Sequence, residues 1–268
     1  MEKKNDVNIL FLSMPLSILT AIVSYAGIFI QSTYSRETIS YAAQGIGQDI
    51  VNLFIVVPIL LIASYFAYRK SKLGLLIWSG AISYLTYSYT IYCFGLHFNN
   101  LFVIYCIILG LSFYSLAYFV TYSLQENVSE WFSKKISTKS TGIFLIIIAV
   151  LFYFIWLSEI IPAIMMNEIP KSIIESGLLI NPVHVLDLAI CLPALIITGI
   201  ALIKKRKAGF LLAPTMLIFC ILMAIAIAAM VLVMKSKGMD SNMVLFSVFG
   251  LITLISTLFL VRYLRALK

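Results

Sequence analysis

Residues 49–74 read DIVNLFIVVPILLIASYFAYRKSKLG, and residues 184–209 read HVLDLAICLPALIITGIALIKKRKAG. Each stretch begins with an apolar run of about twenty residues, the length at which a helix spans the hydrocarbon of a bilayer. Each run ends at a basic cluster that is closely followed by a glycine. With a shift of 135 residues, the two stretches agree at eight of 26 positions without a gap. The pattern predicts two related membrane helices, each ending at a basic loop.

The composition of the whole chain is that of an integral membrane protein. Of its 268 residues, 62% are hydrophobic and 11% are charged, and the mean hydropathy is +1.05. A soluble domain is about half apolar and about a quarter charged. The formal charge of +8 does not indicate nucleic acid, because the basic residues form short clusters between apolar runs. We therefore expect a lipid bilayer around the chain and no nucleic-acid partner.

Eight apolar runs predict an all-α bundle with eight membrane spans. Helices are expected rather than a barrel because the runs are continuously apolar and do not alternate. The first run is expected to be a retained helix, since it is long and no signal-peptide cleavage site follows it. The predicted helices cover residues 9–30, 50–68, 73–95, 100–123, 141–163, 185–203, 208–234 and 243–261.

The basic residues predict the orientation of these spans. With alternate loops assigned to opposite sides, 15 of the 19 Lys and Arg residues fall on one side. The other side receives only Arg36, Lys171, Lys235 and Lys237. The positive-inside rule makes the first side cytoplasmic. We therefore expect a multi-pass protein of the cytoplasmic membrane with both termini in the cytoplasm.

The 135-residue shift extends over much of the chain and suggests an internal repeat. Pro58 meets Pro193, and Gly74 meets Gly209. Each half would hold four spans, an even number, so both halves would enter from the cytoplasm as parallel repeats. The alternative is that every inner loop is basic and one proline coincides. We expect a 4+4 tandem repeat, with residues 1–133 as the first unit and 134–268 as the second.

Ionisable side chains near apolar spans are costly and mark candidate sites. Asp49 and Asn52 are three residues apart and share a helix face, and so do His184 and Asp187. Glu159 is expected near the outer end of the fifth helix. If the repeat holds, these side chains would meet at the outer mouth of the bundle. There they could bind a proton, a cation or another small polar ligand.

Two other interpretations of these residues stay open. Asp49 and Asn181 could cap the N-termini of their helices, and His184 could pair with Asp187. A metal ion held by His97, His184 and Asp187, or a haem between the two histidines, is a further alternative. This ligand spacing resembles no known metal signature. The sequence therefore leaves the cofactor undetermined.

Two prolines and a group of tyrosines add weaker signals. Pro58 and Pro193 lie in the middle of their spans, where each frees a carbonyl group and kinks its helix. Such breaks line substrate paths in transporters, although proline is also common in structural membrane helices. Eight tyrosines in the third and fourth helices could line a pocket, or could form interfacial belts and packing contacts. They are Tyr84, Tyr87, Tyr89, Tyr92, Tyr105, Tyr114, Tyr118 and Tyr122.

The sequence carries no motif of a known catalytic site. The four cysteines show no CxxC spacing, and P-loop, HExxH and GxSxG patterns are absent. An enzymatic activity is therefore not indicated.

The segment Gly47-Gln48-Asp49 with Asn52 and Pro58, followed by residues 181–187, resembles a group of uncharacterised multi-pass membrane proteins from bacteria and archaea. The resemblance covers the second to the seventh predicted helix and implies no particular activity. We expect a small transporter or permease-like protein with an outward-facing polar site between helices two and six. The alternatives are a membrane redox, metal- or haem-binding protein that uses its outer histidines, and a non-catalytic partner or sensor subunit. A further copy of the chain or a partner subunit is left open.

Overall fold

The regular structure of the described residues is helical throughout. It comes from a computed structural model that describes residues 6–124, 126–133, 136–239 and 243–268. Within these ranges no strand is formed. In chain order the elements are α1 (Val7–Phe29), η1 (Gln31–Tyr34), α2 (Ile39–Val51), η2 (Asn52–Val56), α3 (Val57–Tyr68), α4 (Lys72–Gly95), α5 (Phe102–Leu124), η3 (Val128–Trp131), α6 (Thr138–Met166), α7 (Lys171–Ser176), α8 (Pro182–Leu186), η4 (Asp187–Cys191), α9 (Leu192–Ile203), α10 (Lys207–Ser236) and α11 (Met243–Leu264).

Within the described ranges, seven helical segments are long and apolar enough to cross a membrane. Two of them are composite, because α2, η2 and α3 form one continuous span, and α8, η4 and α9 form another. The long helix α4 is not among the seven. Its sequence is rich in tyrosine and serine, and its buried residues face other helices. The seven apolar helices identify a membrane-embedded protein, whereas the eight spans expected from the sequence exceed this number by one.

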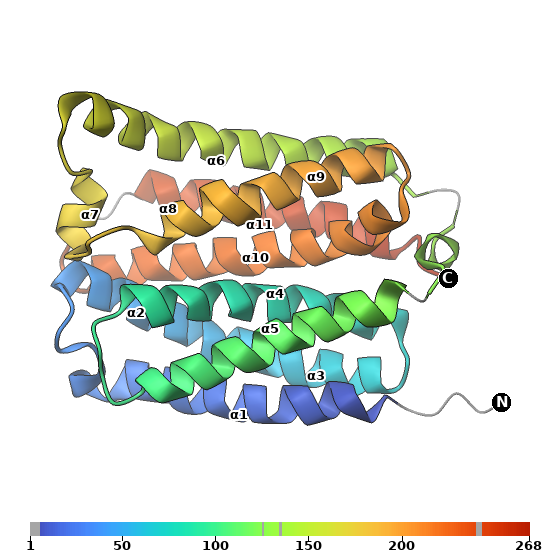
Figure 1. Ribbon diagram of the computed structural model, residues 1–268, viewed down its shortest axis with the longest axis horizontal. Helices are drawn as coiled ribbons and strands as arrows, with labels where there is room; N and C mark the ends of the chain where they lie inside the picture. Colours follow the sequence, from blue (N-terminus) through green and yellow to red (C-terminus); the bar gives the residue numbers. More distant parts are fainter. Residues whose placement is uncertain (1–5, 125, 134–135, 240–242) are drawn as a thin grey trace.

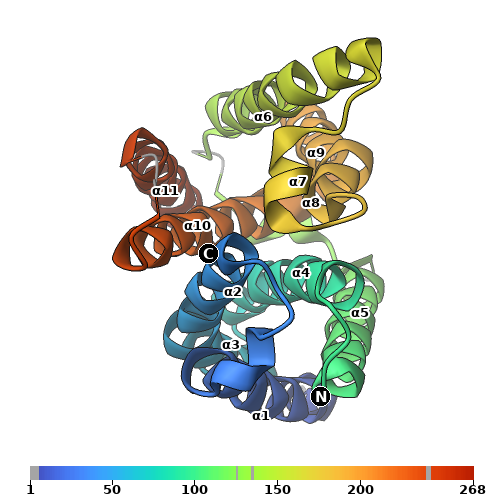
Figure 2. The same ribbon diagram turned by 90° about the vertical axis from the view of Figure 1, so that its left-hand side faces the viewer.

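The long helices form two groups that meet along α10 (Figures 1 and 2). In the first bundle, α1, α2–α3, α4 and α5 close a ring, as Figure 2 shows. In the second bundle, α6, α8–α9, α10 and α11 are arranged more openly. Helix α10 packs against both α2 and α4. Gly47 makes this approach close, because a Cβ atom there would lie 2.5 Å from the Met230 Cα.

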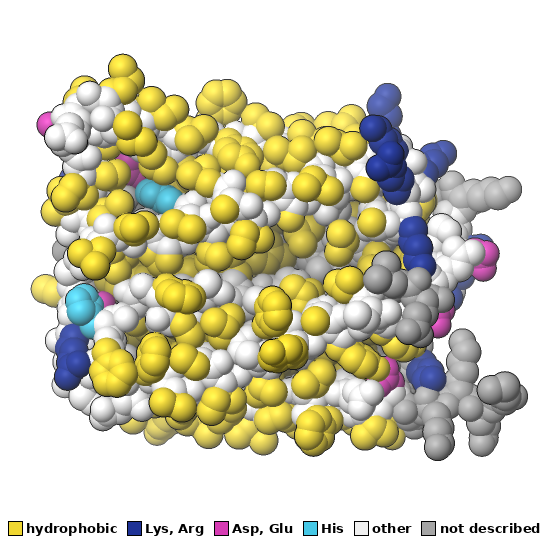
Figure 3. Space-filling view, viewed as in Figure 1, with side chains coloured by type: hydrophobic (Ala, Val, Ile, Leu, Met, Phe, Trp, Pro, Cys, Tyr) yellow, Lys and Arg dark blue, Asp and Glu magenta, His cyan; other side chains and the backbone are white. Residues whose placement is uncertain are grey.

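The two ends of the molecule differ in charge. The first residues of α1 and the C-terminus lie at the same end as the α3–α4 and α9–α10 loops (Figure 1). Lys and Arg side chains gather at this end, and apolar side chains cover the middle of the surface in Figure 3. We call it the basic end. The loops that place lysines there are short, so α3 and α4, and likewise α9 and α10, are antiparallel neighbours.

The α3–α4 and α9–α10 hairpins have the same local structure. η2 and η4, α3 and α9, and the first residues of α4 and α10 are all 135 residues apart. Lys70 and Lys205 both adopt a positive φ, 63° and 52° respectively. After each of them, the N–H of Ser71 or Arg206 donates to a carbonyl five residues earlier, at 2.9 and 2.8 Å.

Both prolines follow a π-helical turn. Pro58 and Pro193 lack the N–H that would continue the α-helical ladder, and their rings crowd the carbonyl four residues earlier. The N–H of the residue before each proline donates instead to the carbonyl five residues earlier, that of Asn52 or Asp187. The ladder is therefore interrupted at the two positions where the sequence predicted kinks. Such π-helical turns are rare and are frequent at functional sites.

The second span begins earlier than the sequence predicted. It starts at Ile39, where the Thr38 side chain accepts an amide hydrogen bond at 3.2 Å as the N-cap. Asp49 therefore lies well inside the helix, and the interpretation of Asp49 as an N-cap is wrong. The segment before Asp49 is rich in polar and small residues, so its hydropathy hides a helix that packs against protein. Asn181 does cap α8, accepting an amide hydrogen bond at 2.9 Å.

The connection between the bundles is tied to the C-terminus. The Ser133 N–H donates to the Ala266 carbonyl at 2.7 Å, and the Lys268 N–H donates to the Trp131 carbonyl at 2.8 Å. Val128 in the same connection is buried. These contacts hold the described part of the linker against the basic end.

Candidate functional site

A carboxyl group is completely enclosed in the first bundle. Asp49 on α2 has no exposed surface. Its Oδ2 accepts a hydrogen bond from the Tyr34 hydroxyl at 2.5 Å, and its Oδ1 accepts one from the Tyr92 hydroxyl at 3.0 Å. Within the described residues no Lys, Arg or His forms an ion pair with it. A buried carboxyl without a basic partner is uncommon, because burying an unpaired charge is costly.

Two glycines make room for this carboxyl group and its tyrosine. A Cβ atom at Gly27 on α1 would lie 1.7 Å from the Asp49 Oδ2, and one at Gly45 would lie 2.8 Å from the Tyr34 Cζ. Burial, with Asp49 beside it, raises the pKa of the Tyr34 hydroxyl well above its ordinary value. Tyr34 therefore stays protonated at neutral pH and can donate to Asp49.

The polar network continues from α2 into η2, at Asn52. The Tyr84 hydroxyl on α4 donates to the Asn52 Oδ1 at 2.9 Å. The Gln48 Nε2 donates to the Tyr84 hydroxyl and to the Ser88 Oγ, both at 2.8 Å. The Nδ2 of Asn52 is buried and has no hydrogen-bond partner among the described residues. An unpaired amide of this kind is a place where water or a ligand is expected.

A second polar cluster joins η4 and α6 of the second bundle to α4 of the first. The Asp187 Oδ1 accepts a hydrogen bond from the Tyr87 hydroxyl at 2.9 Å, and its Oδ2 accepts one from the Trp156 indole at 2.8 Å. The His184 ring contacts the same indole, with ring centroids 4.7 Å apart. The Glu159 carboxylate lies 3.9 Å from the His184 Nε2. His184 and Asp187 thus share Trp156 and have no hydrogen bond to each other within the described chain.

We expect Tyr87→Phe to lower the free energy of unfolding by about 1–3 kcal/mol, because it deprives the buried Asp187 carboxyl of a donor. Denaturation in mixed micelles, followed by circular dichroism, measures this loss. Tyr114→Phe is the matched control, since the Tyr114 side chain is exposed. Equal stabilities of the two variants would contradict a structural role for the Tyr87 hydroxyl.

The structure groups the five predicted site residues into two clusters. Asp49 and Asn52 belong to one network, while His184, Asp187 and Glu159 belong to the other. Among the described residues, no hydrogen bond or ion pair joins the two clusters. Helix α4 serves both, because its tyrosines reach α2 in one direction and η4 in the other.

The predicted set of metal ligands is not assembled. The His97 Nδ1 lies 2.9 Å from the Glu37 carboxylate, whose side chain is 1% exposed. Across the described parts of the chain, no three His, Cys, Asp or Glu side chains lie close enough to hold a metal ion together. His97, His184 and Asp187 therefore do not form a common site, because His97 pairs with Glu37, whereas His184 and Asp187 contact Trp156 on α6.

The partners of the buried acids are mainly aromatic residues, to which the sequence alone assigned no single role. The tyrosines of the third predicted helix could line a pocket, or could form interfacial belts and packing contacts. Tyr84, Tyr87 and Tyr92 are in fact buried donors, and Tyr34 and Trp156 join them from other helices. The four-residue spacing of Tyr84, Ser88 and Tyr92 was the available signal, since it places three hydroxyls on one helix face.

No protein-family model, curated protein or solved structure matches the chain. The function is therefore argued from the geometry of the two clusters.

Proposed function

We propose that the chain is an eight-span protein of the cytoplasmic membrane, with two related units, 1–133 and 134–268. The equal 135-residue offsets of the two hairpins support the repeat. The position of α4 within the bundle supports its assignment as the eighth span. The basic end is assigned to the cytoplasm by the positive-inside rule, so both termini are cytoplasmic.

We further propose that the protein is a small transporter or permease-like protein, with its polar site at Asp49 and Asn52. One observation carries this proposal: Asp49 is fully buried, accepts hydrogen bonds from two tyrosine hydroxyls and has no basic partner in the described structure. A carboxyl group in such a place is stable when it holds a proton or a cation. The adjacent π-helical turn and the unpaired Asn52 amide support a site that rearranges around a bound species.

Ion flux into proteoliposomes tests this proposal. Three probes are used separately: protons with an entrapped pH indicator, and Na⁺ and K⁺ with entrapped cation indicators. We expect flux of at least one ion to exceed that of empty liposomes, and Asp49→Asn to return it to the empty-liposome rate. The amide keeps the size of the side chain but cannot carry the exchangeable charge.

Glu175→Gln is the matched control. It removes an exposed carboxylate whose ion pair with Lys171 lies on the surface helix α7. We expect this variant to keep the flux of the unmodified protein. If the unmodified protein conducts none of the three ions, or if Asp49→Asn conducts as well as it does, the transport proposal is overturned.

A further inference from the structure

Helix α1 carries a row of buried hydroxyl groups that face the interior of the first bundle. Ser13, Ser17, Thr20 and Ser24 recur at intervals of three or four residues, and each is at most 2% exposed. The Trp78 indole donates to the Ser13 Oγ at 2.7 Å. The other three hydroxyls have no well-directed hydrogen bond among the described residues, although Thr20 and Ser24 lie beside the Tyr89 hydroxyl. Buried unpaired hydroxyls are costly in a membrane protein unless water satisfies them.

The end of this row that carries Thr20 and Ser24 adjoins the Asp49 site. The Ser24 hydroxyl lies beside the Asp49 carboxyl group and beside the Tyr89 hydroxyl. Tyr89 also lies beside Thr20, is fully buried and has no well-directed hydrogen bond within the described chain. Asp49 is therefore the acidic group at one end of a continuous series of hydroxyl groups.

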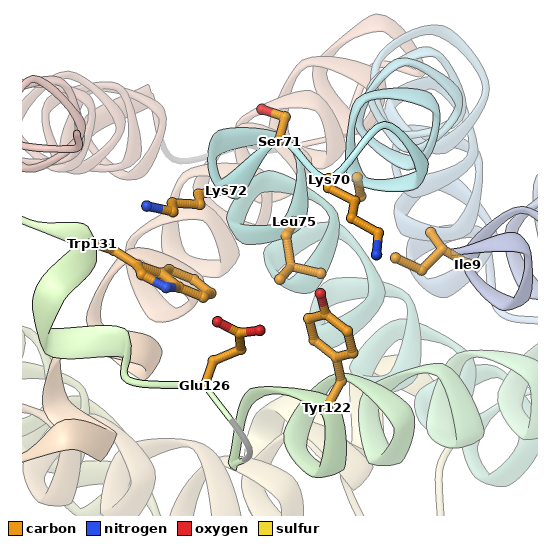
Figure 4. A pocket seen from close by; sticks show the side chains of 9 residues that line it. Ile9, Lys70, Ser71, Lys72, Leu75, Tyr122, Glu126 and Trp131 are labelled. Atoms are coloured by element: carbon orange, nitrogen blue, oxygen red, sulfur yellow. The ribbon is translucent and has the colours of Figure 1, made fainter. Parts of the chain in front are cut away.

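The other end of the row, at Ser13, approaches a small cavity at the basic end. This cavity has a volume of about 50 Å³, and Ile9 and Leu75 form part of its lining. Ile9 lies one helical turn from Ser13, and Leu75 lies about one turn from Trp78. Figure 4 shows the side chains of Tyr122 and Glu126 directed toward this cavity. A cavity of this size has room for a few water molecules.

We propose that a file of water molecules joins the hydroxyls of α1, and that Asp49 exchanges its proton with the basic end through this file. The inference rests on the proposed function and names its ion. Successive hydroxyls are one helical turn apart, about 5.4 Å, which is close to two hydrogen bonds of about 2.8 Å each. One water molecule between each pair of hydroxyls would therefore complete the chain.

The chemistry of the row favours a proton over a metal cation. Serine, threonine and tyrosine hydroxyls both donate and accept, so each can receive a proton on one side and release another on the other side. A dehydrated metal cation instead needs several oxygen ligands at every step of its path. The row offers about one hydroxyl per turn, which suffices only for proton relay.

The transfer is balanced as a simple proton relay. The O–H bond of protonated Asp49 breaks as the lone pair of a neighbouring water takes the proton. Each hydroxyl and water in turn passes one proton onward, and one proton leaves into the cavity beside Glu126. Asp49 remains as a carboxylate that accepts hydrogen bonds from Tyr34 and Tyr92. No electron is transferred, and each hydroxyl and water forms one O–H bond as it breaks another.

Proton flux into proteoliposomes and unfolding in micelles are measured for Ser17→Ala and Thr20→Val. We expect proton flux to fall about tenfold in each variant, because a hydrogen bond is lost from the relay. We expect stability to stay equal or to rise, since each substitution removes a buried hydroxyl that has no well-directed hydrogen bond in the described structure. Ser256→Ala on α11 is the matched control, because Ser256 is also buried and unpaired among the described residues. Its flux should be unchanged.

The outcomes separate the relay from the proposed function. Proton flux that depends on Asp49 but is unaffected by Ser17→Ala and Thr20→Val overturns the relay and leaves the transporter proposal standing. Flux of Na⁺ or K⁺ without proton flux likewise overturns the relay and leaves the transporter proposal standing. The absence of all ion flux overturns both proposals. Reduced proton flux with retained stability supports the relay, whereas a parallel loss of stability assigns the hydroxyls a packing role and contradicts it.

Discussion

Gly27→Ala is expected to lower the free energy of unfolding by about 3 kcal/mol, as overpacking of a full interior does. The added Cβ atom would lie 1.7 Å from the Asp49 Oδ2, closer than any non-bonded contact allows. The carboxyl group must then move away from Tyr34 and Tyr92, and the buried site loses its donors. Denaturation in mixed micelles measures this loss of stability. In the proteoliposome assay, Gly27→Ala should conduct ions at the same low rate as Asp49→Asn.

Gly110→Ala on α5 is the matched control for this prediction. A Cβ atom at Gly110 meets nothing within 4 Å. Alanine is about 1 kcal/mol more favourable than glycine inside a helix, so this variant should be as stable as the unmodified protein or more stable. A second test combines Gly27→Ala with Asp49→Ala, which removes the clashing atom. We expect Gly27→Ala to cost much less in that background, and an equal cost in both backgrounds would show that Asp49 is not the obstacle.

Gly74→Ala and Gly209→Ala are each expected to lower the free energy of unfolding by about 2–3 kcal/mol, because the obstacle is backbone. A Cβ atom at Gly74 would lie 2.6 Å from the Ala67 nitrogen, and one at Gly209 would lie 2.3 Å from the Leu202 nitrogen. Either helix of the hairpin must move away to admit the methyl group. Denaturation in mixed micelles gives both values.

This second prediction also tests the repeat. The two glycines and the two nitrogens that they approach are each 135 residues apart, so related hairpins should respond alike. Gly250→Ala on α11 is the control, since its Cβ atom would meet nothing within 4 Å. A large loss for one hairpin glycine and none for the other would contradict the structural equivalence of the two hairpins.

The candidate site could be predicted from the sequence only in part. Asp49, Asn52, His184 and Asp187 were identified because polar side chains beside apolar runs are costly and therefore conspicuous. Their spacing also predicted that each pair shares one helix face. The division of the four into two clusters could not be deduced, because it depends on how α2 and η4 are set around α4. The donors Tyr34 and Trp156 were missed, since a lone aromatic residue in a membrane sequence has no distinguishing pattern.

The limits of the fold prediction have a similar cause. Hydropathy identified every apolar span, because lipid selects for continuous apolar runs. It failed at residues 39–48, where a helix packs against α10 and can therefore carry glycine and glutamine. It also treated residues 73–95 as a span like the others, whereas the tyrosines and serines of α4 lower its hydropathy, and α4 is not among the seven apolar helices.

The sequence alone determined that the chain is a helical membrane protein, where its basic loops lie and which prolines interrupt its helices. These features follow from local composition and spacing, which act within one helix. Tertiary structure alone decided that Asp49 is enclosed by Tyr34, Tyr92 and Gly27, and that Asp187 belongs to a different cluster. Such arrangements depend on contacts between helices that are distant in sequence, where a single methyl group or hydroxyl determines what can approach.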